Sequence, residues 1–281
     1  MIRVLQAGLH TSVQDIGRFG YRNIGVPTSG TMDTISANFA NALLNNNKND
    51  AVLEVTMYGP KLEFTIPTVI TITGAEMSAK LNNISIANYK KYSIKKGDIL
   101  SFGELTKGLR CYLAVKGGFK TAKVLKSRSF YNGITLKDSL KKHDTILYDS
   151  YVDDIVPFNS AIKSTTLFFE TNILEVYKGP DFNLFTLEEQ QKICSNKYTI
   201  SNLMDRMGYR VKETVIKHSK SILTSPVLPG TVQLIPSGQL IILMKDAQTT
   251  GGYPRILQLT EKSIAILAQK KEGDIFNFLL V

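Results

Sequence analysis

Residues 244–256 read Met-Lys-Asp-Ala-Gln-Thr-Thr-Gly-Gly-Tyr-Pro-Arg-Ile, and a continuous apolar run at 240–244 leads into them. The run is typical of a buried strand that ends before Asp246. Glycines allow a ligand to lie against bare backbone, and Pro254 restricts both its own φ and the conformation of Tyr253, so we expect a stiff loop. A stiff polar loop at a strand end is typical of a binding site, although a polar hairpin turn has the same composition.

The length and composition indicate an ordinary soluble protein with two domains. The chain has 281 residues, of which 43% are hydrophobic and 21% are charged, so each half is large enough to bury a core. No apolar run reaches the length of a membrane span, and the first eight residues lack the features of an export signal. We therefore expect a cytoplasmic protein.

Cysteine and histidine are too sparse to indicate a metal site. Cys111 and Cys194 lack the paired spacing of metal or redox motifs, and they fit reduced thiols in a cytosol. The histidines, His10, His143 and His218, are far apart in the sequence and none sits near another candidate ligand. We therefore expect no metal site built by the protein.

The net charge of +10 is compatible with nucleic-acid binding, but its distribution favours another interpretation. The lysines are scattered singly or in pairs beside expected turns, which is typical of a solvated surface. Seven of the eight arginines lie in stretches rich in Gly, Asp, Ser or Tyr, and arginine suits bidentate recognition of a carboxylate or phosphate. These arginines are Arg18, Arg22, Arg110, Arg128, Arg206, Arg210 and Arg255.

The N-terminal half predicts one helix among many short strands. A first strand is expected at residues 2–6, and residues 8–30 form a glycine-punctuated segment without periodicity, which is typical of a functional loop. Thr31 or Asp33 can cap the helix that follows. Its apolar face is expected to contain Ile35, Phe39 and Leu43. The clearest further strands are expected at 53–57, 62–65, 69–73, 99–102 and 110–115.

Weak internal echoes favour two related barrels over a single doubly wound sheet. Leu-Glu-Val followed by Gly-Pro occurs at 53–60 and again at 174–180. A Gly-Asp-Ile turn occurs at 97–99 and again at 273–275. Repetition of this kind indicates related structural units, and many short strands with few helices favour a barrel or a sandwich.

The expected domain boundary lies in residues 153–166, which are polar and lack periodicity. We therefore predict a mainly β protein with two β-barrel domains, residues 1–160 and residues 161–281. Short helices are expected after Thr186 and after Thr260, where the residues have the spacing of helix caps.

Four polar clusters contain the candidate chemistry. The first comprises Gln14, Asp15, Arg18, Ser29, Gly30 and Asp33, and the second comprises Lys126, Ser127, Arg128 and Ser129. The third comprises Asp205, Arg206, Met207, Gly208, Tyr209 and Arg210, and the fourth is the opening loop. None of the four clusters has aliphatic residues at its centre, and expected strands flank each of them. This pattern favours a fold in which the four clusters meet at one cleft. A structural role is open for each, because Asp–Arg pairs often pin loops and Asp often caps a turn.

Several common catalytic motifs are missing from the sequence. There is no Gly-x-Ser-x-Gly elbow, no phosphate loop and no Gly-x-Gly-x-x-Gly fingerprint. The candidate catalytic groups are therefore carboxylates that act as acid or base, together with arginines and backbone amides that neutralise charge.

Four segments, in this order, resemble motifs of the allophanate hydrolase subunit 2 family. They are residues 11–33, 108–118, 205–210 and 246–255, and the resemblance runs nearly end to end. It implies a pair of cyclophilin-like β-barrels. Standalone members of the family form the C subunit of the prokaryotic 5-oxoprolinase, also described as an antagonist of the kinase inhibitor KipI. The same module occurs in the carboxyltransferase region of urea carboxylase.

The resemblance implies that the chain joins a KipI-like B subunit and an A subunit to open the lactam of 5-oxo-L-proline to glutamate. ATP is the implied cofactor of that complex. Two alternatives stay open: carboxyl transfer from carboxybiotin, for which partners would bring the biotin carrier, and a non-catalytic antagonist of a KipI-type inhibitor. Binding to nucleic acid or to a membrane is not expected.

We assign catalytic and substrate-binding roles in this chemistry to the residues of the four clusters. Asp246 is the candidate acid or base, Asp15 is a second catalytic candidate, and Arg206 and Arg18 neutralise charge. Orientation of the substrate is assigned to Gln248, Thr249 and Tyr253. Further substrate contacts are expected from Gln14, Ser29, Asp33, Ser127, Arg128, Asp205, Arg210, Thr250, Gly251 and Gly252. These roles require that Asp15, Arg18, Arg206, Asp246 and Thr249 share a single pocket.

Overall fold

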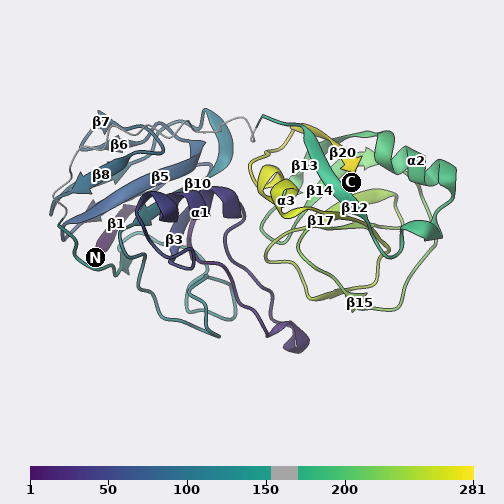
Figure 1. Ribbon diagram of the computed structural model, residues 1–281, viewed down its shortest axis with the longest axis horizontal. Helices are drawn as coiled ribbons and strands as arrows, with labels where there is room; N and C mark the ends of the chain where they lie inside the picture. The colour runs from purple at the N-terminus through teal and green to yellow at the C-terminus, as the bar shows by residue number, and fades with distance from the viewer. Residues whose placement is uncertain (153–169) are drawn as a thin grey trace. The chain divides into compact units, whose positions relative to one another are not determined.

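The computed structural model describes residues 1–152 and 170–281, which fall into two compact units (Figure 1). The first unit contains Met1–Arg18 and the described part of Ser29–Thr166. The second contains Phe19–Thr28 and the described part of Leu167–Val281. The predicted boundary segment, and with it the division between residues 160 and 161, lies outside the described residues. The mainly β class is confirmed.

The strands of the first unit form two sheets. One has the order β11–β1–β4–β9–β6–β7, and the other has the order β2–β3–β10–β5–β8. The bounds in the first sheet are β1 Ile2–Gln6, β4 Lys61–Phe64, β6 Lys80–Leu81, β7 Ile84–Ser85, β9 Ile99–Ser101 and β11 Thr145–Ile146. Those in the second are β2 His10–Gln14, β3 Val52–Thr56, β5 Thr68–Glu76, β8 Lys91–Ile94 and β10 Lys107–Val115.

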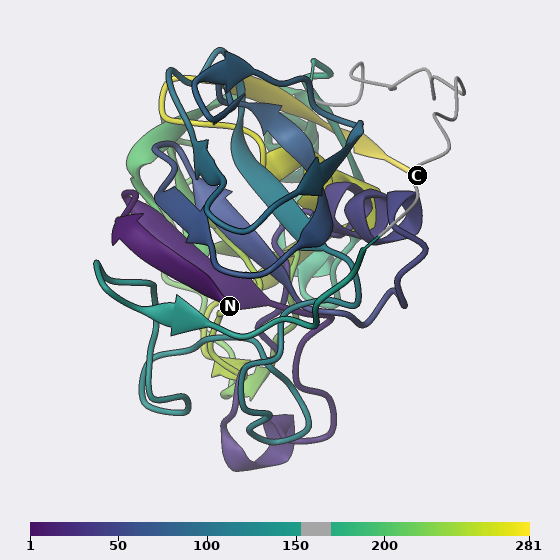
Figure 2. The ribbon, with the colours of Figure 1, turned by 90° about the vertical axis from the view of Figure 1, so that its left-hand side faces the viewer.

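Both sheets of the first unit contribute to one apolar core, which includes Ile2, Leu62, Ile72 and Leu113. Helix α1 (Thr34–Leu43) lies against the opposite face of β5 and β10 (Figures 1 and 2). Strand β5 is therefore covered on both faces, which suits its run of β-branched residues. The two predicted barrels differ in form, because the first unit keeps two sheets whereas the second unit closes.

Helix α1 begins as predicted, but its buried face is different from the predicted one. The Asp33 side chain accepts a hydrogen bond from the amide of Ser36 at 2.9 Å, which confirms the cap. The helix buries Ala37 and Ala40, whereas Ile35 is 40% exposed. Small residues face the sheet because the helix backbone approaches β5 and β10 closely, and apolar spacing alone does not reveal that constraint.

The second unit is a closed seven-stranded barrel with the strand order β12–β19–β16–β17–β14–β13–β20. Its strands are β12 Ile173–Lys178, β13 Lys197–Met204, β14 Gly208–Thr214, β16 Thr231–Leu234, β17 Gln239–Leu243, β19 Arg255–Leu259 and β20 Ile275–Leu280. A separate ribbon joins β15 (Ser225–Pro226) to β18 (Thr250–Gly251). Side chains alternate between the interior and the outside: in β14, Tyr209 and Val211 are buried, while Arg210 is exposed. The barrel thus has an apolar inside and a partly polar outer face.

The two helices predicted for the second unit are present. Helix α2 (Leu187–Ser195) begins with a capping box formed by Thr186 and Glu189. Helix α3 (Glu261–Leu267) begins after Thr260, whose side chain accepts from the amide of Ser263 at 3.2 Å. Two short 3-10 turns, η1 (Arg22–Ile24) and η3 (Phe182–Leu184), also belong to this unit. Within the described residues no helix is long and apolar enough to cross a membrane.

The predicted Gly-Asp-Ile echo is one turn used three times. In residues 95–98, 271–274 and 141–144, the Asp side chain accepts from the amide three residues earlier at 2.7, 2.9 and 2.8 Å. The third residue of each turn has a positive φ: Gly97 (92°), Gly273 (87°) and His143 (74°). The third copy is not apparent in the sequence because histidine replaces glycine.

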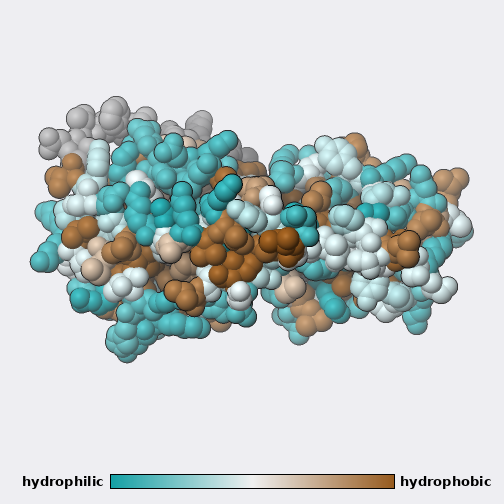
Figure 3. Space-filling view, turned by 90° about the horizontal axis from the view of Figure 1, so that it is seen from below, coloured by the Kyte–Doolittle hydropathy of each residue, from teal (hydrophilic) through white to brown (hydrophobic). Residues whose placement is uncertain are grey.

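The lysine pairs behave as a solvated surface with one exception. Their members are exposed at 90–91, 95–96 and 141–142, and the face drawn in Figure 3 is largely hydrophilic with patches of hydrophobic residues. Lys270, in contrast, is only 5% exposed, and its Nζ donates to Asn172 Oδ1 at 2.8 Å. Burial lowers the pKa of Lys270 from its ordinary value.

Candidate functional site

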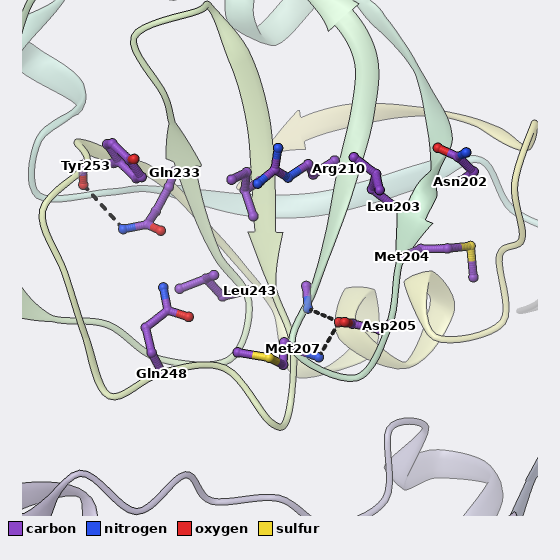
Figure 4. Close-up of a pocket in the computed structure, with 12 residues that line it drawn as sticks. Asn202, Leu203, Met204, Asp205, Met207, Arg210, Gln233, Leu243, Gln248 and Tyr253 are labelled. Carbon is purple, nitrogen blue, oxygen red and sulfur yellow. Dashed lines mark hydrogen bonds between the residues drawn. The ribbon is translucent and has the colours of Figure 1, made fainter. Parts of the chain in front are cut away.

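A cleft of about 610 Å³ lies on the outer face of the second barrel, over β13, β14, β16 and β17 (Figure 4). Its described lining consists of Asn202, Leu203, Met204, Asp205, Met207, Gly208, Arg210, Gln233, Ile241, Leu243, Gln248 and Tyr253. Alternation along the strands creates this lining, because residues whose neighbours fill the barrel must project outward. Two of the four predicted clusters, the third and the opening loop, therefore meet at one cleft.

A cation, an apolar side chain and an amide form a row across the floor of the cleft. Ile241 of β17 pairs with Gln233 of β16 on one side and with Arg210 of β14 on the other. Neighbouring strands lie about 4.8 Å apart, so the Cα atoms at the two ends of the row are about 10 Å apart. Figure 4 shows the side chains of Arg210, Gln233 and Gln248 around the same space.

Arg210 differs from the other arginines selected in the sequence. It is exposed, and its guanidinium makes no hydrogen bond or ion pair with any described residue. The other six each contact described residues. A guanidinium that no protein group engages is available to a carboxylate or another planar anion.

Gln233 was not predicted, although it is the most buried polar residue of the cleft. It is 1% exposed, and its Nε2 donates to Tyr253 O at a long 3.4 Å. Its Oε1 accepts no hydrogen bond from the described residues. In the sequence it is one polar residue at an outward position of a strand, which looks like ordinary surface, so no local signal marks it.

The opening loop covers one side of the cleft, and one of its two glycines serves close packing. A Cβ at Gly251 would lie 2.5 Å from Gln233 Nε2, so a side chain there would displace the glutamine. Gly252 has only ordinary contacts, at 3.9 Å and beyond. The loop is held at its far end by Arg255, whose Nε donates to Asp181 Oδ2 at 2.8 Å. These contacts attach the loop to the barrel at Gly251 and at Arg255, while its stiffness stays a prediction.

Arg206 and Asp246, the two central catalytic candidates of this unit, bind each other. Arg206 Nε donates to Asp246 Oδ2 at 2.6 Å, and Nη2 donates to Oδ1 at 3.2 Å. The Asp246 amide also donates to Arg206 O at 2.8 Å. The two side chains are 10% and 9% exposed and do not belong to the lining of the cleft. Any acid–base role of Asp246 therefore has to operate from within an ion pair that joins the β13–β14 turn to the opening loop.

Asp205 and Thr249 both accept hydrogen bonds from backbone amides, Asp205 through its side chain and Thr249 through its carbonyl. The Asp205 carboxylate accepts from the amides of Met207 and Gly208 at 2.7 and 3.0 Å, so it shapes the turn between β13 and β14. The Thr249 carbonyl accepts from the Val227 amide at 3.1 Å. Thr250 lies in β18 and pairs with Pro226.

The first and second predicted clusters meet in the first unit, around Asp15. Its carboxylate accepts from the hydroxyls of Ser127 and Ser129, both at 2.7 Å, and from the Arg128 amide at 2.7 Å. The Gly17 amide donates to it at 2.9 Å. Asp15 is 7% exposed. These contacts are typical of a carboxylate that ties two distant segments together, since its lone pairs are already used.

The turn that delivers Ser127 has an unfavourable backbone conformation. Leu125 and Lys126 have positive φ values of 52° and 64°, which residues with a Cβ rarely adopt. The bridge between Val124 and Ser127 closes the turn. The hydrogen bonds to Asp15 stabilise this conformation, and strain of this kind often accompanies functional sites.

The remaining predicted residues of the first unit are buried. Arg18 is fully buried, and its Nη2 donates to Ser129 O. Gln14 is fully buried, with Nε2 donating to Ser12 Oγ at 2.9 Å. Ser29 is 1% exposed with a φ of 55°, and Asp33 caps α1. In this unit the structure brings the predicted residues together as an internal polar network.

A buried carboxylate in this network was not predicted from the sequence. Glu54 Oε2 accepts from the Met32 amide at 2.7 Å and from the Tyr112 hydroxyl at 2.9 Å. Burial and the negative charge of Glu54 raise the pKa of Tyr112 well above its ordinary value. The signal was present, because Glu54 interrupts an apolar strand between Leu53 and Val55, and a charge at such a position needs buried partners.

The single pocket predicted for Asp15, Arg18, Arg206, Asp246 and Thr249 stays a prediction. Asp15 and Arg18 belong to the first unit, and the other three belong to the second. The residues of each unit contact partners within that unit.

Helix N-termini, which are common phosphate sites in proteins, carry side-chain caps in both units. The side chains of Asp33, Thr186 and Thr260 each accept from one first-turn amide of α1, α2 and α3, respectively. Within the cleft, Arg210 is one unpaired guanidinium, whereas a triphosphate needs several donors. No group of three or more His, Cys, Asp or Glu side chains in the described residues could hold a metal ion.

Comparison with known proteins places the chain among carboxyltransferase domains. Residues 24–280 match the family model described as "Carboxyltransferase domain, subdomain A and B". The chain is 31% identical to the C subunit of 5-oxoprolinase from Escherichia coli (strain K12) over 289 residues, covering 99% of this chain and 91% of that protein. It is 41% identical to urea amidolyase of Saccharomyces cerevisiae over 312 residues, covering 99% of this chain and 16% of that protein.

A solved structure shows the same arrangement of elements. The crystal structure of K. lactis urea amidolyase aligns with a TM-score of 0.87 at 28% identity, covering 100% of this chain and 18% of that one. The chain thus spans less than a fifth of the length of the amidolyases, while it covers 91% of the C subunit of the E. coli 5-oxoprolinase.

Proposed function

Because the chain belongs to the family of carboxyltransferase domains with subdomains A and B, we propose that it is the C subunit of an ATP-dependent 5-oxoprolinase. The complex opens 5-oxo-L-proline to L-glutamate, and the chain acts together with a KipI-like B subunit and an A subunit. The family resemblance found in the sequence supports this proposal. So does the extent of the match to the E. coli protein, which covers both chains almost completely.

The observation that carries the proposal is the row of Arg210, Ile241 and Gln233 across the cleft. 5-Oxo-L-proline has a carboxylate, a short hydrocarbon part and a cyclic amide. Arg210 can bind the carboxylate through two parallel hydrogen bonds. Ile241 and Leu243 offer an apolar surface to the ring carbons, and Gln233 can accept from the lactam N–H and donate to its carbonyl.

The loop residues complete this binding arrangement. Gln248 and Tyr253 line the cleft opposite the strands and can orient the ring. Once the loop and a partner exclude water, donors aimed at the lactam oxygen stabilise the negative charge that develops there. ATP is the cofactor of the proposed complex, and transfer of its terminal phosphoryl group, with ADP leaving, would activate the lactam oxygen. Asp246, paired with Arg206, remains the candidate acid or base.

Kinetics of Arg210 variants in the reconstituted complex test the proposal. Arg210→Ala should raise KM for 5-oxoproline by roughly tenfold to a hundredfold, since a hydrogen bond to a charged group contributes about 1.5–3 kcal/mol. Lys212→Ala is the matched control, because Lys212 lies on the same strand with a side chain 50% exposed and outside the cleft lining. Equal effects of the two substitutions, or no 5-oxoproline-dependent ATP hydrolysis by the complex, would refute the proposal.

A second candidate function is carboxyl transfer from carboxybiotin. The identity of 41% to urea amidolyase favours it, and the cyclic urea of biotin presents the same N–H and C=O groups to Gln233 as a lactam does. Partners would supply the biotin carrier. Transfer of carboxyl from free carboxybiotin to an acceptor, in the absence of 5-oxoproline turnover, would favour this function. If the complex showed neither activity, a non-catalytic antagonist of a KipI-type inhibitor would remain.

A further inference from the structure

An N-terminal segment of ten residues, Phe19–Thr28, belongs to the second unit. It folds as a compact turn around η1: the Val26 amide donates to Tyr21 O at 3.3 Å, and the Gly25 amide donates to Arg22 O at 3.1 Å. Gly25 has a φ of 83° with open space around it, so the backbone alone requires glycine there. The turn holds Arg22 in a fixed position.

Arg22 contacts carbonyl groups of the second unit. Its Nη2 donates to Val227 O and, at 3.4 Å, to Thr249 O, while Nη1 lies 3.5 Å from Thr28 Oγ1. It makes no ion pair with a carboxylate among the described residues. Partial burial therefore lowers the pKa of Arg22 from its ordinary value. The contacts are those of a hydrogen-bond donor rather than of a counter-charge.

The two carbonyls that Arg22 engages lie at the base of the β15–β18 ribbon. The Val227 amide donates to Thr249 O at 3.1 Å, so one guanidinium clamps the two residues that open the ribbon. Gln248, which lines the cleft, immediately precedes Thr249. Two residues beyond Thr249, Gly251 packs against the Gln233 side chain. The clamp thus acts at the root of the loop that covers the cleft.

We propose that Arg22 is a positioning residue for the cleft. By binding both strands of the ribbon, it fixes the loop that carries Gln248 and Tyr253 before a ligand arrives. Pre-arrangement of this kind improves binding because the loop loses less conformational freedom when the ligand binds. This role goes beyond the proposed function, since it concerns the loop and requires no particular substrate.

Hydrogen exchange of the full-length chain tests the clamp without any ligand. In Arg22→Met, which keeps the length of the side chain but removes its donors, exchange in peptides covering 225–228 and 246–253 should accelerate by about tenfold to a hundredfold. Arg22→Lys should restore much of the protection, because an ammonium can still donate to the carbonyls. The control is Arg3→Met, which removes an exposed ion pair with Glu63 in the first unit.

Barrel strands β12 and β20 serve as the internal reference for this measurement. Local acceleration with unchanged exchange in these strands supports a clamp. Unchanged exchange in the two loop peptides, or equal acceleration throughout the barrel, overturns it. In the active complex, Arg22→Met should raise KM by about tenfold with little change in kcat. If the complex has no such activity, the exchange result still decides the proposal.

Discussion

Replacement of Asp246 by asparagine tests what the Arg206–Asp246 pair does. The pair has two charge-assisted hydrogen bonds, at 2.6 and 3.2 Å, between side chains that are 10% and 9% exposed. Removal of one partner from a buried pair typically costs about 3–5 kcal/mol. Asparagine keeps one acceptor oxygen, so we expect Asp246→Asn to lower the free energy of unfolding of the second unit by roughly 2 kcal/mol.

A double-mutant cycle with Arg206→Gln separates the pair from its surroundings. Chemical denaturation of the wild type, both single variants and the double variant should give a coupling free energy of about 1–2 kcal/mol, because each single substitution already disrupts the same two hydrogen bonds. Arg255→Gln, which weakens a different ion pair of the same unit, should instead add to Asp246→Asn.

Turnover of the same four proteins then distinguishes catalysis from positioning. If Asp246 is the acid or base, kcat falls by roughly a hundredfold or more in both variants that lack it. If the pair only holds the loop, the double variant regains activity to within about tenfold of the wild type, since neither charge is left buried alone. Additive stability changes, or a change below about 0.5 kcal/mol for Asp246→Asn, would refute the reasoning from the structure.

Three further predictions concern single contacts. Asp15→Ala should lower the unfolding free energy of the first unit by roughly 3 kcal/mol, measured by denaturation, because it leaves the Ser127 and Ser129 hydroxyls and two amides without their acceptor; a loss as small as that of a surface substitution would contradict it. His143→Gly should raise stability by about 0.5–1 kcal/mol, seen as a higher Tm, since φ is 74° there; Gly97→Ala should do the reverse, and a lower Tm for His143→Gly would count against the turn. Burial raises the pKa of Asp181, but hydrogen bonds from the Arg255 side chain and amide outweigh this effect and hold that pKa below its ordinary value. The ion pair therefore stabilises the folded second unit above about pH 4. This contribution to the free energy of unfolding disappears as the pH falls through the depressed pKa. Asp181→Asn should therefore flatten the acid side of the stability profile, and an unchanged profile would exclude this contribution.

Much of the architecture followed from local patterns. Short β-rich runs, glycine turns and the caps at Asp33, Thr186 and Thr260 are set by neighbouring residues, and all appear in the structure. The buried side of α1 could not be predicted in the same way. Its alanines face the sheet because of close backbone approach, which depends on strands β5 and β10 much later in the chain.

The polar clusters could be predicted from the sequence, but the contacts within them could not. Asp15 finds its partners at Ser127 and Ser129, and Asp246 finds its partner at Arg206. The sequence shows that each of these carboxylates lies in a polar segment between expected strands. Only the fold shows that each already has partners within the protein. Gln233 is the opposite case, since burial under Gly251 turns an ordinary polar strand residue into a central group of the cleft.

Strand β20 determines when the barrel of the second unit can close during synthesis. It lies between β12, with which it runs parallel, and β13, with which it runs antiparallel. Until residues 275–280 leave the ribosome, both neighbours present unpaired edges that can adhere to other nascent chains. The described strands of the first unit are complete by Ile146. Translation therefore passes through a period in which these strands are complete while the barrel of the second unit still lacks the strand that closes it.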